Sequence, residues 1–298
     1  MKCVTPLSLL LAALLLVSGA YAHATDVYRI RGPQSEFDTS HAYYAGLLKM
    51  ALEATRAEFG DSQIVYQGNL NQAREMVELE SGKLINVGMV GTSKEREKRL
   101  IPIRIPLNKG TLGYRLFIIH KDNQQKFDRI QTIEQLKKLS ICQGSDWPDS
   151  DIMEAAGFTV IRNQDYESLF EQVSQKRCDF FPRGIHEGFT EMQARTASYP
   201  DLILYQRLAL TYTFPMYFFI SPQHPELAKR LETGLKTLLD NGEFDLYLEG
   251  HPVTRSLFPL EKWQETLAFA IDNPFLPEET PLQDSRLWLT LPFTETGK

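Results

Sequence analysis

The segment TSKER at 92–96 holds the first group of side chains that could do chemistry, and it follows a short apolar stretch. Thr92 and Glu95 have the spacing of a helix-capping box, in which the hydroxyl accepts a backbone N–H and the carboxylate reaches back. Arg96 then falls in the first turn of a helix, where a cation opposes the helix dipole by up to ~1 kcal/mol. An anionic ligand beside Arg96 would explain this placement. The alternative is that 94–99 is a solvated helix face of alternating charge.

A second group lies in the turn Gly144-Ser145-Asp146-Trp147. A glycine turn that leads into a helix presents free backbone N–H groups to an anion, and Ser145 adds a hydroxyl. The charge of Asp146 opposes an anion. Two alternatives stay open: Ser145 and Asp146 are helix caps, and Trp147 packs under the loop instead of stacking on a ligand.

Arg183, His186 and Glu187 form a third group. Arg183 either faces an acidic ligand or forms a structural ion pair with Glu187. His186 and Glu187 suggest an acid and a base, but adjacent residues on a helix point in different directions. The sequence has no nucleophile–base constellation, no metal-ligand spacing and no phosphate-binding loop. It therefore favours a binding protein over an enzyme, with no metal and no cofactor.

Two runs of alternating strand and helix patterns position these groups. The first run has strands at 27–30, 64–66 and 85–90, with helices at 41–59 and from 69 or 71 to 81. The second has strands at 140–143, 159–162 and 178–181, the last stopped by Pro182, with helices at 148–156 and 166–176. Further helices are expected at 185–196, 225–240 and 261–271. The β-α-β-α-β order predicts an α/β fold of two lobes, each a parallel-type sheet flanked by helices. Ligands collect at the carboxyl ends of such strands, so the three groups should face one another across a cleft.

Length, charge and the N-terminal segment bound the class of protein. The 298 residues suggest about two domains, and a net charge of −6 argues against a broad nucleic-acid surface, which needs clustered basic charge. Lys2, an apolar run at 7–17 and the small-x-small sequence Ala20-Tyr21-Ala22 predict a signal peptide over 1–22, cleaved after Ala22 or Ala24. The mature chain is expected to be a soluble, periplasmic monomer.

Five segments carry a resemblance to a known family: GTSKERE, PIRIPLNKGTLGYR, QGSDWPDSDIMEAAG, CDFFPRGIHE and NPFLPEETPL. The chain resembles solute-binding protein family 3, the periplasmic substrate-binding proteins of amino-acid ABC transporters, in an uncharacterised branch. The resemblance implies the type II periplasmic-binding fold, with lobe 1 formed by 25–112 and 213–298 and lobe 2 by 113–212. Two crossing strands between the lobes would allow hinge closure around a ligand.

The same resemblance bears on the cysteines that remain after cleavage, Cys142 and Cys178. An oxidising compartment permits a disulfide, although two buried thiols are the alternative that the residues alone leave open. The family topology places the strands of Cys142 and Cys178 side by side in one sheet. This placement supports the hypothesis that Cys142 and Cys178 form a disulfide or a thiol contact. A disulfide requires Cα atoms within ~7 Å.

The resemblance also assigns a ligand site. Arg96 matches the family arginine that pairs with the ligand's carboxylate through its planar fork. Thr92 and Ser93 lie near hydroxyl positions that assist it, and Gly144-Ser145 falls where the second lobe binds the same carboxylate.

The chain departs from the family pattern at the ammonium site. Amino-acid binders place an aspartate there, five residues beyond the aspartate of the last lobe-2 strand, and counting from Asp179 gives Gly184. Arg183 takes over this place unless Glu187 reaches in. Two arginines facing one gap would favour a ligand with two anionic groups. For the aromatic wall of lobe 1, Tyr43 and Tyr44 are the candidates, one of them packing on the core.

The expected function is therefore capture of a small, anionic, carboxylate-bearing solute or amino acid in the interlobe cleft. The partner would be a membrane transporter of the ABC type. The alternatives are a ligand-sensing or partner-binding module of a signalling system, and an enzyme of the dehydratase type on the same fold.

Overall fold

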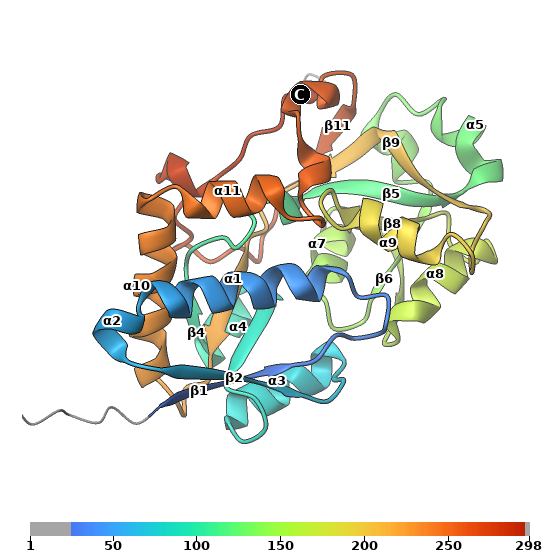
Figure 1. Cartoon of the computed structure of the whole chain (residues 1–298). Coiled ribbons are helices and arrows are strands. Elements are labelled where there is room, and N and C mark those ends of the chain that lie inside the picture. Colours follow the sequence, from blue (N-terminus) through green and yellow to red (C-terminus); the bar gives the residue numbers. More distant parts are fainter. Residues whose placement is uncertain (1–24, 296–298) are drawn as a thin grey trace, which may run out of the picture.

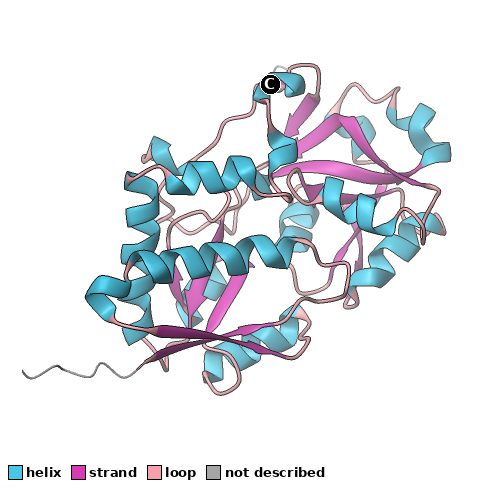
Figure 2. Cartoon of the chain, in the orientation of Figure 1, coloured by secondary structure: helices cyan, strands magenta, loops and turns pink. Residues whose placement is uncertain are grey.

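The computed structural model describes residues 25–295 of the chain, and its helices surround strands in two lobes that lie side by side (Figures 1 and 2). The expected signal peptide over 1–22 and its cleavage after Ala22 or Ala24 lie outside the described residues. Within 25–295, no helix is both long and apolar enough to span a bilayer. The predicted α/β fold with two lobes is confirmed.

Lobe 1 is built on strands β1 (Asp26–Arg31), β2 (Ser62–Gln67), β3 (Val87–Gly91), β4 (Ile101–Ile103) and β10 (Met216–Ile220). β1 and β2 are parallel, and β10 runs antiparallel between β3 and β4. Asn86 joins β1 to β3: its backbone N–H donates to the Arg29 carbonyl at 2.9 Å, and its side-chain oxygen accepts from the Arg29 N–H at 2.7 Å. The strands of lobe 1 therefore lie in the order β2-β1-β3-β10-β4, as a two-stranded sheet, β1-β2, and a three-stranded sheet, β3-β10-β4, linked through Asn86.

The helices of lobe 1 are α1 (Ser40–Ala54), α2 (Arg56–Phe59), α3 (Gln72–Ser81), α4 (Lys94–Arg99), α10 (Glu226–Asp240) and α11 (Glu243–Gly250). α1 and α10 pack against each other through buried leucines such as Leu48 and Leu235. Gly234 permits this approach, because a Cβ at this position would collide with the backbone of Ala51. The main core of lobe 1 lies between these two helices and its sheet.

Lobe 2 repeats the same strand order with β5 (Tyr114–His120), β6 (Ser140–Gly144), β7 (Thr159–Asn163), β8 (Phe180–Gly184) and β9 (Leu202–Thr211). β6 pairs in parallel with β7 and β8, while β5 runs antiparallel between β8 and β9. Helices α5 (Gln124–Phe127), α6 (Ile133–Leu136), α7 (Pro148–Ala155), α8 (Tyr166–Ser174) and α9 (Gly188–Arg195) flank the sheet. The lobe-2 sheet is mixed, and lobe 1 combines the parallel pair β1-β2 with the antiparallel sheet β3-β10-β4. Neither lobe is purely parallel, because each receives one reversed strand, β10 or β5, where the chain crosses between lobes.

Two strands extend the lobe-2 sheet beyond β9: β11 (Leu267–Ala270), which pairs with β9, and β12 (Thr294–Glu295), which pairs with β11. The expected boundary, with 213–298 in lobe 1, is therefore wrong for these strands. The expected helix at 261–271 is also wrong, since a 3₁₀ turn at Leu260–Trp263 leads into β11. The open edge of β9 offers a backbone ladder to this apolar segment, and that long-range pairing prevails over its local helical pattern.

The segment 271–293, which we call the tail strap, leaves β11, crosses to lobe 1 and returns to β12. The Lys94 N–H donates to the Phe275 carbonyl at 3.0 Å, and the Leu289 N–H donates to the Lys109 carbonyl at 2.8 Å. Arg286 forms an ion pair with Asp240 at 3.2 Å. The tail strap thus ties the edge of the lobe-2 sheet to α4 and α10 of lobe 1.

Local signals in the sequence fix several element ends. Asn71 and Asp165 cap α3 and α8, and Thr132 with Gln135 forms a capping box at α6. The expected box at 92–95 is wrong, because the Ser93 hydroxyl caps α4 while the Thr92 hydroxyl donates to Glu97 Oε1 at 2.7 Å.

The strand was expected to stop at Pro182, and this expectation is wrong. β8 continues to Gly184, with Pro182 opposite Phe117 of β5. β6 is paired with β8 at Phe180, so the missing N–H of Pro182 lies beyond that pairing.

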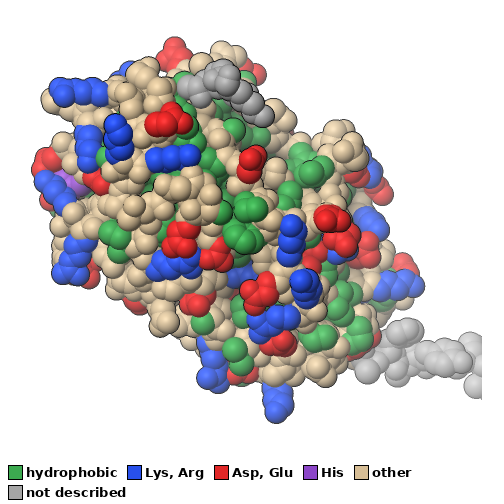
Figure 3. Space-filling view, turned by 180° about the vertical axis from the view of Figure 1, so that it is seen from behind, with side chains coloured by type: hydrophobic (Ala, Val, Ile, Leu, Met, Phe, Trp, Pro, Cys, Tyr) green, Lys and Arg blue, Asp and Glu red, His purple; other side chains and the backbone are tan. Residues whose placement is uncertain are grey.

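A disulfide links Cys142 of β6 to Cys178 in the turn before β8, with Cα atoms 5.7 Å apart. Both cysteines are buried in the core of lobe 2. On the face of the molecule seen in Figure 3, acidic and basic side chains are interspersed, without a broad basic surface.

Candidate functional site

Residues of both lobes enclose a cavity of about 70 Å³. Its wall is formed by Arg31, Gln34, Asp38, Ser40, His41, Tyr44, Gln72, Met89, Gly91, Leu112, Phe214 and Met216 on one side and by Arg115, Trp147, Pro148, Asp149, Tyr166, Arg183 and Glu187 on the other. Arg31, Gly91 and Arg183 lie at the carboxyl ends of β1, β3 and β8, where open sheets collect their ligands.

Arg31 brings the first buried charge to this wall. It is 8% exposed, and its Nε lies 2.9 Å from a carboxylate oxygen of Glu75 on α3. Its Nη1 donates to the Gly32 carbonyl at 2.9 Å and to Asp38 at 3.4 Å. Within residues 25–295, its Nη2 has no hydrogen-bond partner. One nitrogen of this guanidinium therefore stays available to a ligand.

Arg115 comes from the crossing strand β5. It forms a close ion pair with Asp149 of α7, and its Nε donates to the Tyr212 hydroxyl at 2.9 Å. Its Nη1 lies 3.7 Å from Glu187. Burial opposes the charge of Arg115, but the attractions of Asp149, Tyr212 and Glu187 together outweigh it, so the pKa of Arg115 is raised. Arg115 is therefore held by lobe-2 partners at the floor of the cavity.

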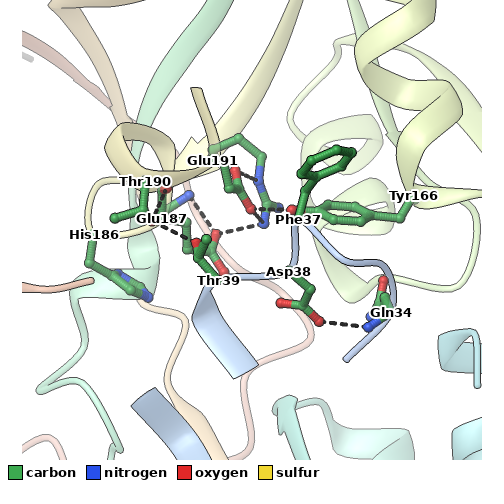
Figure 4. A network of polar contacts seen from close by, with 12 residues as sticks. Gln34, Phe37, Asp38, Thr39, Tyr166, His186, Glu187, Thr190 and Glu191 are labelled. Atoms are coloured by element: carbon green, nitrogen blue, oxygen red, sulfur yellow. Dashed lines mark hydrogen bonds and ion pairs between the residues drawn. The ribbon is translucent and has the colours of Figure 1, made fainter. Parts of the chain in front are cut away.

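Arg183 is the third arginine of the wall and is 6% exposed. Its Nε and Nη2 donate to the two carboxylate oxygens of Glu191 on α9, at 2.8 and 2.6 Å, and Nη2 also lies 3.0 Å from Glu187. Glu191 is fixed in turn by the Tyr166 hydroxyl at 2.5 Å (Figure 4). No residue within 25–295 accepts a hydrogen bond from Arg183 Nη1. The side chain is thus both a structural ion pair and a part of the cavity wall.

The charges of the wall balance. Arg31, Arg115 and Arg183 face Asp38, Asp149 and Glu187. Burial lowers the pKa of His41, which keeps its imidazole neutral near pH 7. The expected pair of uncompensated arginines, and with it the preference for a ligand of two anionic groups, does not hold.

Arg96 lies beside this cavity but is not part of its wall. Its Nη1 donates to the Gly91 carbonyl at 2.7 Å, and its Nη2 donates to Gln72 Oε1 at 2.5 Å and to the Asp146 carbonyl of lobe 2 at 3.0 Å. Burial lowers its pKa to about 10 despite the carboxylate of Glu75 nearby. Arg96 therefore forms a direct hydrogen bond between the lobes.

Known structures share this architecture, although no family model and no curated protein matches the sequence. A histidine kinase sensor domain with similarity to periplasmic binding proteins has a TM-score of 0.56 and 15% identity over 76% of this chain and 94% of its own. An arginine-specific periplasmic binding protein of Salmonella typhimurium has a TM-score of 0.56 and 10% identity, and the match covers 76% of this chain and 98% of that chain. A putative L-cystine ABC transporter of Listeria monocytogenes has a TM-score of 0.54 and 13% identity, and the match covers 76% of this chain and 95% of that chain.

The chain has the periplasmic-binding-protein fold. At these identities the likeness is one of fold, and the ligands named for the neighbours belong to those proteins.

The periplasmic-binding fold brings only some of the expected site residues into the cavity wall. Trp147, Arg183 and Glu187 line it. Gly144 makes room for Trp147, since a Cβ there would collide with the indole. Ser145 lies in a smaller neighbouring hollow between the lobes.

The remaining candidates have other surroundings. Thr92 contacts Glu97, and Ser93 caps α4. Tyr43 is fully buried, donates its hydroxyl to the Leu107 carbonyl at 2.8 Å and stacks on Tyr247, away from the cavity. Its neighbour Tyr44 is the tyrosine of α1 that reaches the wall.

His186 and Glu187 do not form an acid–base pair (Figure 4). His186 is fully buried; its Nε2 contacts the Tyr44 hydroxyl at 3.0 Å and the Asn108 amide at 3.2 Å, and its Nδ1 contacts Thr111 Oγ1 at 3.2 Å. Burial and the charges of Arg115 and Arg183 lower its pKa to about 3. Within 25–295, no group of three or more His, Cys, Asp and Glu side chains could hold a metal.

Sequence reasoning missed Arg31, Asp38, Arg115 and Asp149. The position of Arg31 at the end of the first strand was a usable signal, because the same rule of strand ends pointed to Arg183. Arg115 and Asp149 gave no such signal. They meet only through the contact of the crossing strand β5 with α7.

Proposed function

We propose that this protein is a solute-binding protein that holds a small carboxylate-bearing organic solute, such as an amino acid, in the cavity between its lobes. The observation that carries this proposal is the interlobe cavity with buried charged side chains contributed by both lobes. Closure of two lobes around a ligand buries it from water, which strengthens each hydrogen bond to it.

The chemistry of the wall supports a ligand with an acid group and little net charge. Guanidinium N–H groups bind carboxylates in a planar fork. The carboxylates of Glu187 and Asp149 also face the cavity, where they can accept hydrogen bonds from an amine. A wall of balanced charge suits a zwitterion or a single acid better than a dianion.

Binding can be measured by calorimetry and by thermal shift with the standard amino acids and short mono- and dicarboxylates. A true ligand at a hundred times its Kd should stabilise the chain by about 2.7 kcal/mol. Trp147 in the cavity wall provides a fluorescence signal for the same titrations. Mass spectrometry of small molecules released from natively purified protein would identify the bound solute. Flat titrations with all probes, together with no released molecule, would contradict the proposal.

We further propose a periplasmic location, a monomeric state and delivery of the solute to a membrane transporter of the ABC type. The cellular role is tested by deleting the gene and measuring uptake of the identified solute, and the monomer by light scattering. A sensor role is the second candidate, favoured by the likeness to a histidine kinase sensor domain. Unchanged uptake with a lost transcriptional response to the solute would favour the sensor.

A further inference from the structure

We propose that Arg31 and Arg183, from opposite lobes, bind the acid group of the ligand, while Arg96 holds the two lobes together. This assignment rests on the proposed function and concerns the same cavity. It departs from the expectation drawn from the family resemblance, in which Arg96 contacts the ligand.

Arg31 is fixed with one nitrogen available. Glu75 holds Nε at 2.9 Å, while Asp38 and the Gly32 carbonyl hold Nη1. These partners fix the plane of the guanidinium on the lobe-1 side of the cavity. Nη2 has no acceptor among the described residues, so it can donate to a ligand in the cavity.

Arg183 is fixed in the same way on the lobe-2 side. Glu191 takes the Nε and Nη2 edge of the guanidinium in a fork, and Glu187 adds an ion pair to Nη2 at 3.0 Å. Nη1 lies on the other edge of the planar group, away from Glu191. The ring of Trp147 packs at 5.1 Å from the guanidinium carbon. A carboxylate between Arg31 Nη2 and Arg183 Nη1 would receive a charge-assisted hydrogen bond from each lobe.

Arg96 is less suited to this role because both terminal nitrogens of its guanidinium already donate to acceptors in the protein. Its partners are the carbonyl oxygens of Gly91 and Asp146 and the amide oxygen of Gln72. The bond to Asp146 joins the lobes, and turning the guanidinium into the cavity would break it. Gly91 and Gln72 line the cavity, whereas Arg96 does not.

The cavity also limits the size of the ligand. A volume of about 70 Å³ suits a few water-sized groups, since ~10–15 Å³ is enough to hold one water molecule. The geometry thus points to a compact solute with one acid group, of the size of glycine, alanine or propionate.

The test compares each acid with its primary amide, which has the same shape without the negative charge. The probes are glycine and glycinamide, L-alanine and L-alaninamide, and propionate and propionamide. Removing one arginine leaves a buried carboxylate unpaired, so the variants are Arg31→Gln/Glu75→Gln and Arg183→Gln/Glu191→Gln. Glu75→Gln and Glu191→Gln alone serve as their controls. Arg96→Gln is compared with Arg99→Gln, an exposed arginine on the same helix.

The unaltered protein should prefer the acid over the amide by about 30-fold or more, as expected for a buried charged hydrogen bond. Both double variants should bring this ratio close to one. Arg96→Gln should keep the ratio while ligand dissociation becomes faster, and Arg99→Gln should change neither quantity.

A ratio that collapses in Arg96→Gln but persists in both double variants would overturn the assignment and leave the proposed function intact. Binding of none of these small acids by the unaltered protein would overturn the assignment of a compact acid, while the proposed function is decided by the wider titrations and by mass spectrometry. A crystal structure of the unaltered protein with the bound acid decides the case without variants. Carboxylate oxygens within 3.2 Å of Arg31 Nη2 and Arg183 Nη1 would support the proposal, and oxygens on Arg96 would overturn it.

Discussion

The charge state of His186 is set by its surroundings at the contact between the lobes. Its ring nitrogens contact Tyr44, Asn108 and Thr111, and the nearby guanidinium groups disfavour a positive charge on the ring. A neutral histidine is thus part of the contact between lobe 2 and α1.

This histidine predicts an acid sensitivity of the folded state. Its pKa is about 3 in the folded chain and ~6.5 in an unfolded one, so the unfolded chain binds an extra proton between these values. Stability contributed by neutral His186 is present above pH ~6.5 and is lost as the pH falls toward 3. In His186→Asn, the free energy of unfolding should fall less steeply between pH 6 and 4, by about 1.4 kcal/mol per pH unit. Urea unfolding at several pH values measures this slope, and equal slopes would refute the prediction.

Some residues of the cavity wall could be predicted from the sequence, and others could not. Arg183, Glu187 and Trp147 were candidates because they follow strands, and the fold places them in the cavity wall. Glu75 and Glu191 were not foreseen, since each lies on a helix and meets its arginine only through the packing of that helix on the sheet. Motif matching placed Arg96 in the ligand site, yet its hydrogen bonds lie elsewhere.

At the scale of elements, the disulfide joins two neighbouring segments of the lobe-2 sheet. Cys142 and Cys178 are separated by 36 residues, and closing a loop of this length should stabilise the lobe by about 3–4 kcal/mol. The double variant Cys142→Ser/Cys178→Ser should lose about this much. Denaturant unfolding checks it, with the reduced unaltered protein as a control. A loss below about 1 kcal/mol would contradict the chain-entropy account.

The contact of α1 with α10 gives a second test at this scale. In Gly234→Ala, the new methyl group would meet the backbone of Ala51, so we expect a loss of about 1–3 kcal/mol from overpacking. Gly250→Ala is the matched control, because a Cβ at Gly250 has no heavy atom within 4 Å. Thermal unfolding of both variants measures the difference. Equal melting temperatures would show that the helices separate without cost.

Helix ends were predictable because their signals are local. Asn71, Thr132 and Asp165 each cap the helix that follows them in the chain. The error at 261–271 has the opposite cause: β11 exists because it pairs with Leu208–Thr211 of β9, which lies far away in the sequence. No local pattern encodes that partner.

At the scale of the whole molecule, the loop between β1 and α1 fastens the lobes together on one side of the cavity. Ser35 donates to Glu167 at 2.6 Å, Thr39 to Thr190 at 2.8 Å, and Arg195 to the Phe37 carbonyl at 3.4 Å. The guanidinium of Arg195 also lies 5.4 Å from the centre of the Phe37 ring. These contacts can form only when the lobes are close together.

Phe37→Ala should therefore favour the open arrangement. Loss of the aromatic and cation–π contact is worth about 1–2 kcal/mol, which corresponds to about 5- to 30-fold faster ligand dissociation. Stopped-flow fluorescence of Trp147 measures this rate. Leu246→Ala, at an exposed leucine of α11 outside the cavity wall, is the control. An unchanged dissociation rate in Phe37→Ala would count against this role of the loop.

The division into lobes was predictable because each lobe repeats the same order of elements, whereas the path of the last thirty or so residues was not. The tail strap has the proline-rich composition of a surface segment, and its contacts with Lys94, Lys109 and Asp240 arise only in the folded molecule.

The tail strap has a consequence for how the two halves can part. A hinge of two crossing strands alone would allow the two lobes to open widely. Here three further covalent connections run beside that hinge: the segment from α11 to β11 and the two arms of the tail strap, which are anchored at α4 and α10 in lobe 1 and at β11 and β12 in lobe 2. We expect these added connections to restrict how far the two lobes can separate when a ligand enters.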